Sequence, residues 1–318
     1  MWRLRRLTPC RRSRRQPSCA SRPPRRRKPP SLRSNTLFIK ALHCYMSTTP
    51  SASSNSTSRL RWQARVYHWC FYHTANTLAR WFVSAFNRIH VSGREHLPAQ
   101  GAGRKAFLLI CNHISHFDPP ILAGQTPGKI SWVVALDMYA HPAGRFFFEG
   151  IDAIPVDRQK SDRAAAKESL RRLKRGEPVG LFPEGGIRSG AESIIGGAPL
   201  DEAVGSFAQL ADVPIVPCVM LGTDKLYAKE AWKWRRTTLF IRFGAPLSIA
   251  QAQGMSAADA RADLTRRAEE SMRALAEELR VQNNLSDNDM PMTAQERWKQ
   301  EAEMLAALKS LTAKSAAS

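Results

Sequence analysis

The stretch AFLLICNHISHFD, residues 106–118, decides the fold because it joins a wholly apolar run to a run that contains polar side chains. Six apolar residues in a row, at 106–111, are typical of a strand that is buried on both faces of its sheet. The polar residues behind it would then lie at the carboxyl end of the strand, where open α/β sheets bind their ligands. The stretch therefore predicts a parallel strand that ends in a functional loop.

Apolar runs of strand length recur along the chain. They occupy residues 130–134, 153–156, 179–182, 215–220 and 239–243. The helical pattern at 162–174 separates two of them, as the crossover of a βαβ unit requires. We therefore expect an α/β fold with a central, mainly parallel β-sheet that is flanked by helices.

Two further helices are expected after the last strand. Apolar residues recur at helical spacing from Ala257 to Leu279, and Ser256 stands where it can cap this helix. Thr293 and Glu296 have the spacing of a capping box, which marks the start of a second helix.

Residues 62–90 have the pattern of a helix with two unlike faces, which precedes the sheet. An apolar and a polar stripe recur at steps of three and four residues. The apolar stripe comprises Phe71, Ala75, Leu78, Phe82 and Ala85, and the polar stripe His73, Asn76, Arg80, Ser84 and Asn87. Additional Trp and Tyr residues favour a helix that lies in the headgroup layer of a membrane. Packing of the apolar stripe on the core of the domain is the alternative.

The formal net charge of +21 is concentrated at the N-terminus. Residues 1–45 contain 14 of the 48 Lys and Arg residues and no acidic residue, so the rest of the chain carries 34 basic and 27 acidic side chains. This Arg/Ser/Pro-rich extension cannot bury enough apolar surface to fold alone. It can be an organelle transit peptide, an arm that binds RNA or anionic lipid, or an artefact upstream of a true start at Met46.

Cysteine and hydrophobic patterns exclude several classes of protein. The six cysteines form no C-x-x-C pair, and no His cluster has metal-ligand spacing, so we expect a reduced compartment and no metal. No uncharged apolar run reaches the roughly 18 residues of a membrane-spanning helix, and no secretory signal is visible. We expect a protein that is soluble or lies on a membrane surface.

The loop behind the first strand contains a pair of residues suited to acid–base chemistry. His113 and Asp118 are five residues apart, so a turn can bring the carboxylate onto one imidazole nitrogen. The other nitrogen is then free to take a proton, as in a catalytic triad that lacks its nucleophile.

Two other apolar runs also end in charged residues. One is followed by Glu184 and Arg188, and another by Arg158. Because guanidinium groups match phosphate oxygens in pairs, arginines at converging strand ends indicate a site for a phosphate.

The sequence resembles the glycerolipid acyltransferase family, whose members include lysophosphatidate acyltransferases. The resemblance rests on four ordered blocks, namely NHISHFD at 112–118, AIPVDR at 153–158, FPEGGIRS at 182–189 and VPIVP at 213–217. It implies that His113 deprotonates an acceptor hydroxyl and that Asp118 orients His113. The hydroxyl would then attack the thioester of acyl-CoA or acyl carrier protein without forming an acyl-enzyme.

The same resemblance implies a set of substrate-binding residues. They are Asn112, Arg158, Glu184, Gly185, Arg188 and Pro214. Arg158, Glu184 and Gly185 would bind the glycerol phosphate of the acceptor, and Pro214 would shape the acyl or acceptor pocket. The third block departs from the usual Glu-Gly-Thr-Arg order by one extra residue before Arg188, so the resemblance indicates the reaction more firmly than the acceptor.

The expected protein is an acyltransferase of phospholipid biosynthesis that converts lysophosphatidate to phosphatidate. No cofactor is expected beyond the acyl donor. Expected partners are anionic phospholipids at a membrane surface, and the expected place is the cytoplasmic face of a membrane, with organelle targeting by residues 1–45 left open. The expected segments are an extension at 1–58, a membrane-associating helix at 59–92, the acyltransferase domain at 93–252 and C-terminal helices at 253–318.

Two other functions were weighed against this one. A lipid esterase would need a nucleophile, and the chain contains no G-x-S-x-G elbow. A nucleic-acid-binding protein is supported almost only by the residues before Met46, and no RNA-binding or zinc motif follows them.

Overall fold

The computed structural model describes residues 54–98, 106–159, 162–232, 237–249 and 256–317. The expected extension at residues 1–58 lies outside these ranges up to residue 53, whereas residues 54–58 are the start of a helix and not part of an extension. Within them, the strands are β1 (Asn87–Ser92), β2 (Leu108–Cys111), β3 (Ser131–Ala135), β4 (Ile154–Val156), β5 (Val179–Leu181), β6 (Ile215–Leu221) and β7 (Thr237–Phe243). They form one sheet in the order β1-β7-β6-β2-β5-β3-β4, in which only the β6–β7 pair is antiparallel. The predicted α/β fold with a mainly parallel sheet is confirmed.

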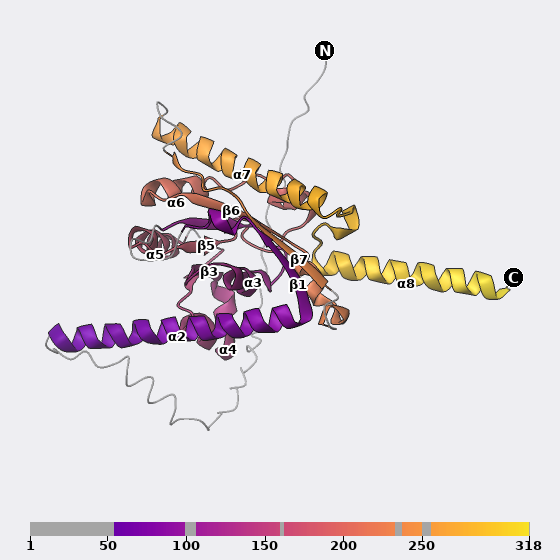
Figure 1. The fold of residues 1–318 in the computed structure, drawn as a ribbon, viewed down its shortest axis with the longest axis horizontal. Coiled ribbons are helices and arrows are strands. Elements are labelled where there is room, and N and C mark those ends of the chain that lie inside the picture. The colour runs from indigo at the N-terminus through magenta and orange to yellow at the C-terminus, as the bar shows by residue number, and fades with distance from the viewer. Residues whose placement is uncertain (1–53, 99–105, 160–161, 233–236, 250–255, 318) are drawn as a thin grey trace, which may run out of the picture. The chain divides into compact units, whose positions relative to one another are not determined.

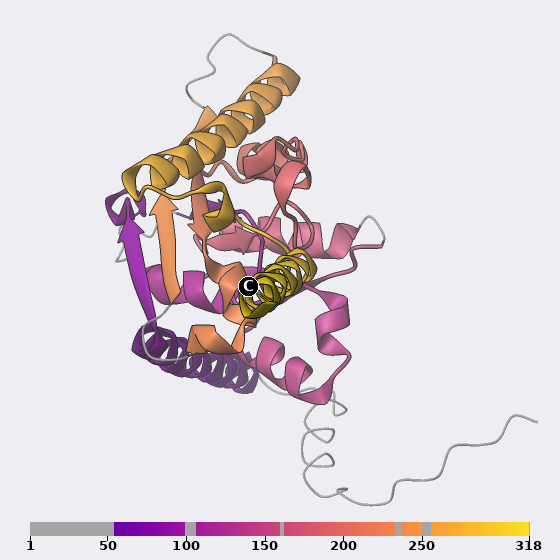
Figure 2. The same cartoon turned by 90° about the vertical axis from the view of Figure 1, so that its right-hand side faces the viewer.

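Helices cover both faces of this sheet (Figure 1). The α-helices are α2 (Ser54–Phe86), α3 (Asp118–Gln125), α4 (Pro142–Gly150), α5 (Arg163–Lys174), α6 (Ala203–Ala211), α7 (Ala257–Gln282) and α8 (Ala294–Ala317). The short 3-10 helices are η1 (Arg94–His96), η2 (Leu136–Tyr139), η3 (Gly190–Glu192), η4 (Ile194–Gly196), η5 (Thr223–Tyr227), η6 (Lys229–Trp232) and η8 (Asp287–Asp289). Figure 2 shows α2 and α7 on opposite sides of the strands.

The central strand β2 divides the apolar core into two halves. Leu109 and Cys111 pack with residues of α2 and α3, whereas Leu108 and Ile110 pack with residues of α6 and α7. Successive side chains of a strand point to opposite faces, so an unbroken apolar run is what a strand between two helical layers requires. The run therefore places the polar loop at 112–118 at the carboxyl edge of the sheet.

The helix that precedes the sheet differs from the prediction at both ends. It begins at Ser54 and ends at Phe86, so the prediction of helix for residues 87–90 is wrong, because these residues open strand β1. Strand β1 pairs in parallel with β7 at the edge of the sheet. Its alternating pattern of polar and apolar residues is typical of a half-buried edge strand.

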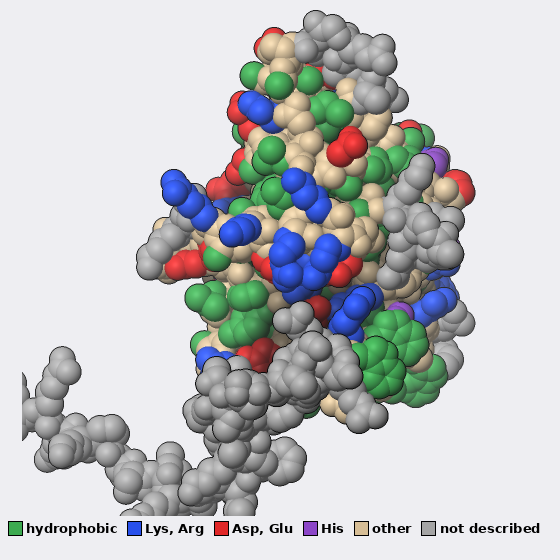
Figure 3. Space-filling model, turned by 90° about the vertical axis from the view of Figure 1, so that its left-hand side faces the viewer, with side chains coloured by type: hydrophobic (Ala, Val, Ile, Leu, Met, Phe, Trp, Pro, Cys, Tyr) green, Lys and Arg blue, Asp and Glu red, His purple; other side chains and the backbone are tan. Residues whose placement is uncertain are grey.

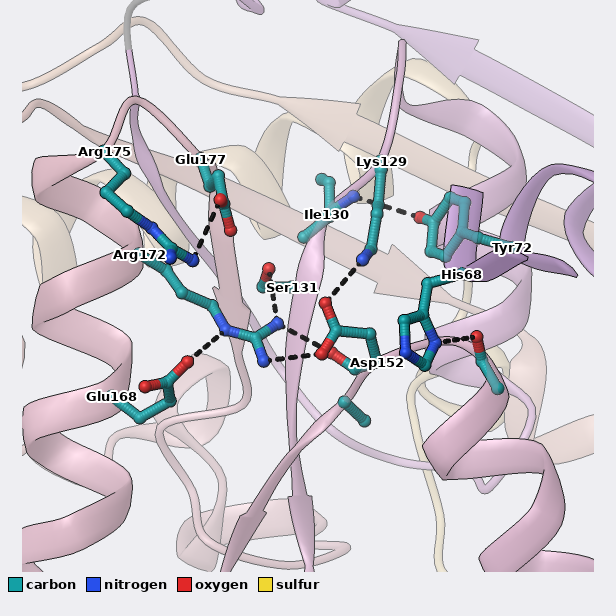
Figure 4. Close-up of polar contacts among 12 residues, drawn as sticks. His68, Tyr72, Lys129, Ile130, Ser131, Asp152, Glu168, Arg172, Arg175 and Glu177 are labelled. Atoms are coloured by element: carbon teal, nitrogen blue, oxygen red, sulfur yellow. Dashed lines mark hydrogen bonds and ion pairs between the residues drawn. The ribbon is translucent and has the colours of Figure 1, made fainter. Parts of the chain in front are cut away.

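Polar contacts hold α2 against the body of the domain (Figure 4). The Tyr72 hydroxyl accepts a hydrogen bond from the backbone N–H of Ile130 at 3.2 Å, and His68 Nδ1 lies 3.1 Å from the carbonyl oxygen of Gly150. Asn76 Nδ2 donates to the carbonyl oxygen of Ala123 at 3.0 Å. The inward face of α2 therefore includes a residue of the predicted polar stripe.

Next to the contact between His68 and Gly150, an ion-pair cluster fixes the turn between α4 and β4 (Figure 4). Asp152 lies 2.7 Å from Lys129 Nζ and 2.8 Å from Arg172 Nη2. Arg172 also bonds Glu168 on its own helix and the Ser131 hydroxyl. These groups tie α5 to the start of β3 and thus support the surface on which α2 lies.

The predicted apolar stripe of α2 is divided between the core and the surface. The Phe71 ring packs on that of Phe146 of α4, with centroids 5.5 Å apart. Leu78 and Phe82 remain 63% and 46% exposed. Packing on the domain therefore describes part of this stripe, and the rest of it is exposed. None of the described helices combines the length and the hydropathy needed to cross a membrane.

Candidate functional site: a His–Asp pair beside an apolar cavity

His113 and Asp118 meet in the loop that follows β2. His113 Nδ1 lies 2.9 Å from Asp118 Oδ2. A carboxylate only accepts hydrogen bonds, so Nδ1 donates and the other ring nitrogen, Nε2, can take a proton from a bound hydroxyl. The His113 ring stacks on Phe182 at the end of β5, with centroids 4.4 Å apart, and this contact fixes the plane of the imidazole.

The Asp118 carboxylate is fully buried and held from several directions. Its Oδ2 atom also accepts from the backbone N–H groups of Ile114 and Ser115, each at 2.8 Å. Its Oδ1 atom accepts from the Thr223 hydroxyl at 2.5 Å. Hydrogen bonds to the ionised form stabilise a buried carboxylate, so these donors offset the cost of its burial.

A cavity of about 520 Å³ opens beside this pair. Its polar end includes His113, His116, Asp137 and Arg158, and most of the remaining lining is apolar. The apolar lining comes from α2, α3, β3, α4 and β5, and it includes Ala75, Pro120, Val133, Phe147, Phe148 and Leu181. This is the usual form of a ligand pocket, in which a few polar groups orient an otherwise apolar ligand.

Arg158 lies at the polar end of the cavity and already has two partners. Its Nη1 atom donates to the carbonyl oxygen of Gly185 at 3.0 Å, and its Nη2 atom lies 2.8 Å from Asp137 Oδ2. Gly185 has φ = 66°, a left-handed conformation that favours glycine, and this explains the glycine behind Glu184. The Arg158–Asp137 pair is exposed, so a bound anion could replace the carboxylate at little cost.

Glu184 connects the His113 loop to the segment behind β5. Its Oε2 atom accepts from the backbone N–H of His113 at 2.6 Å, and its Oε1 atom accepts from Ile194 at 2.9 Å. Burial raises the pKa of Glu184 to about 7, although these two backbone donors oppose the shift. Glu184 is not among the residues that line the cavity. Glu184 holds the loop that contains His113 through the backbone N–H of that residue, whereas we expected it to contact the acceptor phosphate.

Three more of the predicted binding residues lie outside the cavity lining. Asn112 is 2% exposed, and its side-chain amide bonds both the N–H and the C=O of Met220, extending the β2–β6 ladder. Arg188 pairs with Glu192 on the surface. Pro214 precedes β6 and accepts from the N–H of Leu108, which places it at the amino edge of the sheet. Pro214 therefore lies at the opposite edge of the sheet from the His113 loop, whereas we expected it to shape the acyl or acceptor pocket.

The sequence did not indicate two features of the site. Thr223 lies 105 residues beyond Asp118, in η5 behind β6, and only the sheet brings them together. The Phe182 ring is in turn stacked on Trp132, and both line the cavity. Within the described ranges, no three His, Cys, Asp or Glu side chains are grouped as a metal ion would require.

Comparison with known proteins identifies the family of this chain. Residues 88–221 match the Acyltransferase family, and this range contains both His113 and Asp118. The chain is 30% identical over 160 residues to the 1-acyl-sn-glycerol-3-phosphate acyltransferase of Bacillus subtilis (strain 168), a match that covers 50% of this chain and 73% of the relative. The chain thus belongs to the acyltransferase family, and the resemblance of its four sequence blocks is confirmed.

A solved structure is also similar. The crystal structure of the 1-acyl-sn-glycerophosphate (LPA) acyltransferase PlsC from Thermotoga maritima has 18% sequence identity and a TM-score of 0.48, over 76% of this chain and 89% of that one. On the strength of the family match and the Bacillus subtilis relative, the present protein is an acyltransferase of phospholipid biosynthesis.

Proposed function

We propose that this protein transfers a fatty acyl group from acyl-CoA or acyl carrier protein to the free hydroxyl of a lysophospholipid or glycerol phosphate. Lysophosphatidate is the preferred acceptor in this proposal, and phosphatidate is the product. The Bacillus subtilis relative is a 1-acyl-sn-glycerol-3-phosphate acyltransferase, and this supports the choice. No cofactor besides the acyl donor is needed.

The observation that carries the proposal is the His113–Asp118 pair at the polar end of an apolar cavity. His113 Nε2 takes the proton of the acceptor hydroxyl while the oxygen attacks the thioester carbonyl carbon. The new C–O bond forms, the C–S bond breaks, and the thiolate leaves with the proton that His113 returns. Asp118 stabilises the imidazolium between these two proton transfers.

The two ends of the cavity suit the two ends of a lysophospholipid. The apolar lining from α2, α4 and β3 would take a fatty chain. Arg158 at the polar end would bind the acceptor phosphate with its planar guanidinium, after the phosphate displaces Asp137. The acceptor hydroxyl, which is close to the phosphate in a glycerol backbone, would then lie near His113.

We further propose that the protein binds the cytoplasmic face of a membrane through α2. The outward side of this helix exposes Trp62, Trp69, Leu78 and Trp81, each by more than half. In the view from the side on which α2 begins, hydrophobic side chains gather at the lower right, with basic side chains beside them (Figure 3). Aromatic and basic residues together favour the interface of an anionic bilayer.

The experiment that tests the proposed reaction measures release of free thiol from acyl-CoA and from acyl carrier protein. Release should be slow alone, and lysophosphatidate should accelerate it with formation of phosphatidate. Glycerol 3-phosphate and a lysophospholipid without a terminal phosphate serve as alternative acceptors. Rapid release that no acceptor changes, with free fatty acid as the product, would instead identify a lipid hydrolase.

A further inference from the structure

The short helix η5, behind β6, contacts the catalytic loop at two points. The Thr223 hydroxyl donates to Asp118 Oδ1 at 2.5 Å, and both side chains are fully buried. At the other end of η5, the Tyr227 hydroxyl lies 2.6 Å from His116 Nδ1. These residues follow the range 88–221 that matches the family. Thr223 and Tyr227 thus contact the loop from outside the matched range.

Residues between Asp289 and Arg297, in the C-terminal part of the chain, bind η5. Asp224 is fully buried, and its Oδ2 atom accepts from the N–H of Met292 at 3.2 Å and from Arg297 Nε at 2.9 Å, with a second bond from Arg297 Nη2. Lys225 Nζ lies 2.8 Å from Asp289 Oδ1. The start of α8 is thus fastened to the residue next to Thr223.

The start of α8 also reaches the segment behind β5. Glu296 Oε2 accepts a hydrogen bond from the Ser189 hydroxyl at 2.5 Å, and the same atom accepts the capping bond from the Thr293 N–H at 2.6 Å. Ser189 follows Arg188, whose backbone N–H donates to the carbonyl oxygen of His113 at 2.9 Å. The first turn of α8 therefore contacts both segments that touch the catalytic loop.

We propose that Thr223 is a positioning residue for the His113–Asp118 pair, and that Arg297 at the start of α8 holds Thr223 in place. This inference rests on the proposed role of His113 as general base. Three N–H donors fix Oδ2 of Asp118, whereas Thr223 supplies the bond to Oδ1. Without the hydroxyl, a buried carboxylate oxygen loses its partner, and the carboxylate is held less firmly in the orientation that His113 requires.

The buried charge of Asp224 makes the anchor depend on Arg297. Burial raises the pKa of Asp224, and the Arg297 guanidinium opposes that shift. A buried carboxylate that loses its cationic partner is strongly destabilised. Shortening or removing Arg297 should therefore move η5 rather than leave it unchanged, and the displacement should reach Asp118 through Thr223.

The test compares Thr223→Val, which keeps the shape of the side chain, with Thr223→Ser, which keeps the hydroxyl. The assay is acyl transfer to lysophosphatidate in the full chain, with the unfolding temperature of each variant measured in parallel. Loss of one charge-assisted hydrogen bond predicts a fall in kcat of about 10- to 100-fold in Thr223→Val, with both KM values nearly unchanged. Thr223→Ser should recover most of kcat.

Equal activity of Thr223→Val and the wild type, or equal losses in the Val and Ser variants, would overturn the inference. His113→Ala in the same assay separates the two proposals, because a fully active His113→Ala disproves the base, whereas an inactive His113→Ala beside a fully active Thr223→Val disproves the positioning role alone. If Thr223→Val does not fold, Arg297→Lys takes its place, since it keeps the charge but loses the two-point contact. It should lower kcat several-fold, whereas the exposed control Arg266→Lys should not. Unchanged kcat in Arg297→Lys would contradict the anchor.

Discussion

The two walls of the cavity are built in opposite ways. Behind the wall formed by strand ends, two buried carboxylates are each held by two backbone donors, Asp118 by Ile114 and Ser115 and Glu184 by His113 and Ile194. On the wall formed by α2 and α4, the lining is apolar, and the outer surface exposes large aromatic side chains. The first wall fixes the geometry of a proton transfer, and the second tolerates a flexible chain. Within one cavity, proton transfer is thus assigned to one wall and binding of the fatty chain to the other.

The largest effect is expected at His113, the proposed base on the wall formed by strand ends. His113→Ala should lower kcat by roughly 10²- to 10⁴-fold, the usual contribution of general-base catalysis. Steady-state rates of phosphatidate formation measure it. His90→Ala on the edge strand β1 is the control and should retain wild-type rates. Near-normal turnover in His113→Ala would exclude the base.

Asp118→Asn tests the charge of the same pair. Its amide oxygen can keep the bonds to His113 Nδ1 and the two backbone N–H groups, and its amide nitrogen can donate to the Thr223 hydroxyl. The variant should therefore fold, yet lose much of kcat because the imidazolium is no longer stabilised by a negative charge. A wild-type kcat in the folded variant would show that orientation alone is enough.

At the polar end of the cavity, Arg158→Ala should raise the KM of the acceptor by about 10- to 100-fold, because a charge-assisted bond to phosphate is lost. The KM of the acyl donor should be nearly unchanged. Arg266→Ala, in an exposed ion-pair cluster of α7, controls for loss of charge. An effect confined to the acyl donor would reverse the assignment of the two ends.

The raised pKa of Glu184 predicts that the free energy of unfolding of the protein depends on pH. Its pKa is about 7 in the folded chain against 4.5 for an ordinary Glu, so the unfolded chain loses this proton first as pH rises. The stabilisation is thus complete below pH 4.5 and is lost as pH rises through about 7, a change of about 3 kcal/mol in the free energy of unfolding. Urea unfolding of the wild type and Glu184→Gln at several pH values measures it. A constant difference between the two chains would contradict the prediction.

The smallest effect is expected at the exposed surface of α2. Changing Trp69, Leu78 and Trp81 together to Ser should release the protein from anionic vesicles and lower activity several-fold on long-chain acceptors. Activity on a water-soluble acceptor should change less. The control changes exposed apolar residues elsewhere, Leu210 and Val281, to Ser. Unchanged sedimentation of the triple variant with vesicles would remove α2 as the anchor.

The sequence predicted the wall formed by strand ends better than the wall formed by α2 and α4, for a physical reason. Continuous apolar runs marked the six strands from β2 to β7, and the His113–Asp118 contact spans only five residues. Strand β1 was missed because its alternating residues continue the two-faced pattern of α2. Short-range patterns predict elements that are buried all round, and they lose force at half-buried edges.

Long-range partners could not be predicted in the same way. Thr223 reaches Asp118 across 105 residues, and no local pattern marks it. Pro214 belongs to a block that resembles the family, yet its place at the amino edge follows only from the register of β6 against β2. Residue types indicated the chemistry, and strand order determined which of them meet.

The central claim is direct transfer of the acyl group to the acceptor oxygen with His113 as base. Intact-mass measurement of the protein during turnover, combined with analysis of the lipids formed, tests it most directly. With direct transfer, phosphatidate appears at the rate of thiol release and the mass of the protein stays unchanged throughout. A protein heavier by one acyl group, appearing before the product and consumed as the product forms, would contradict it.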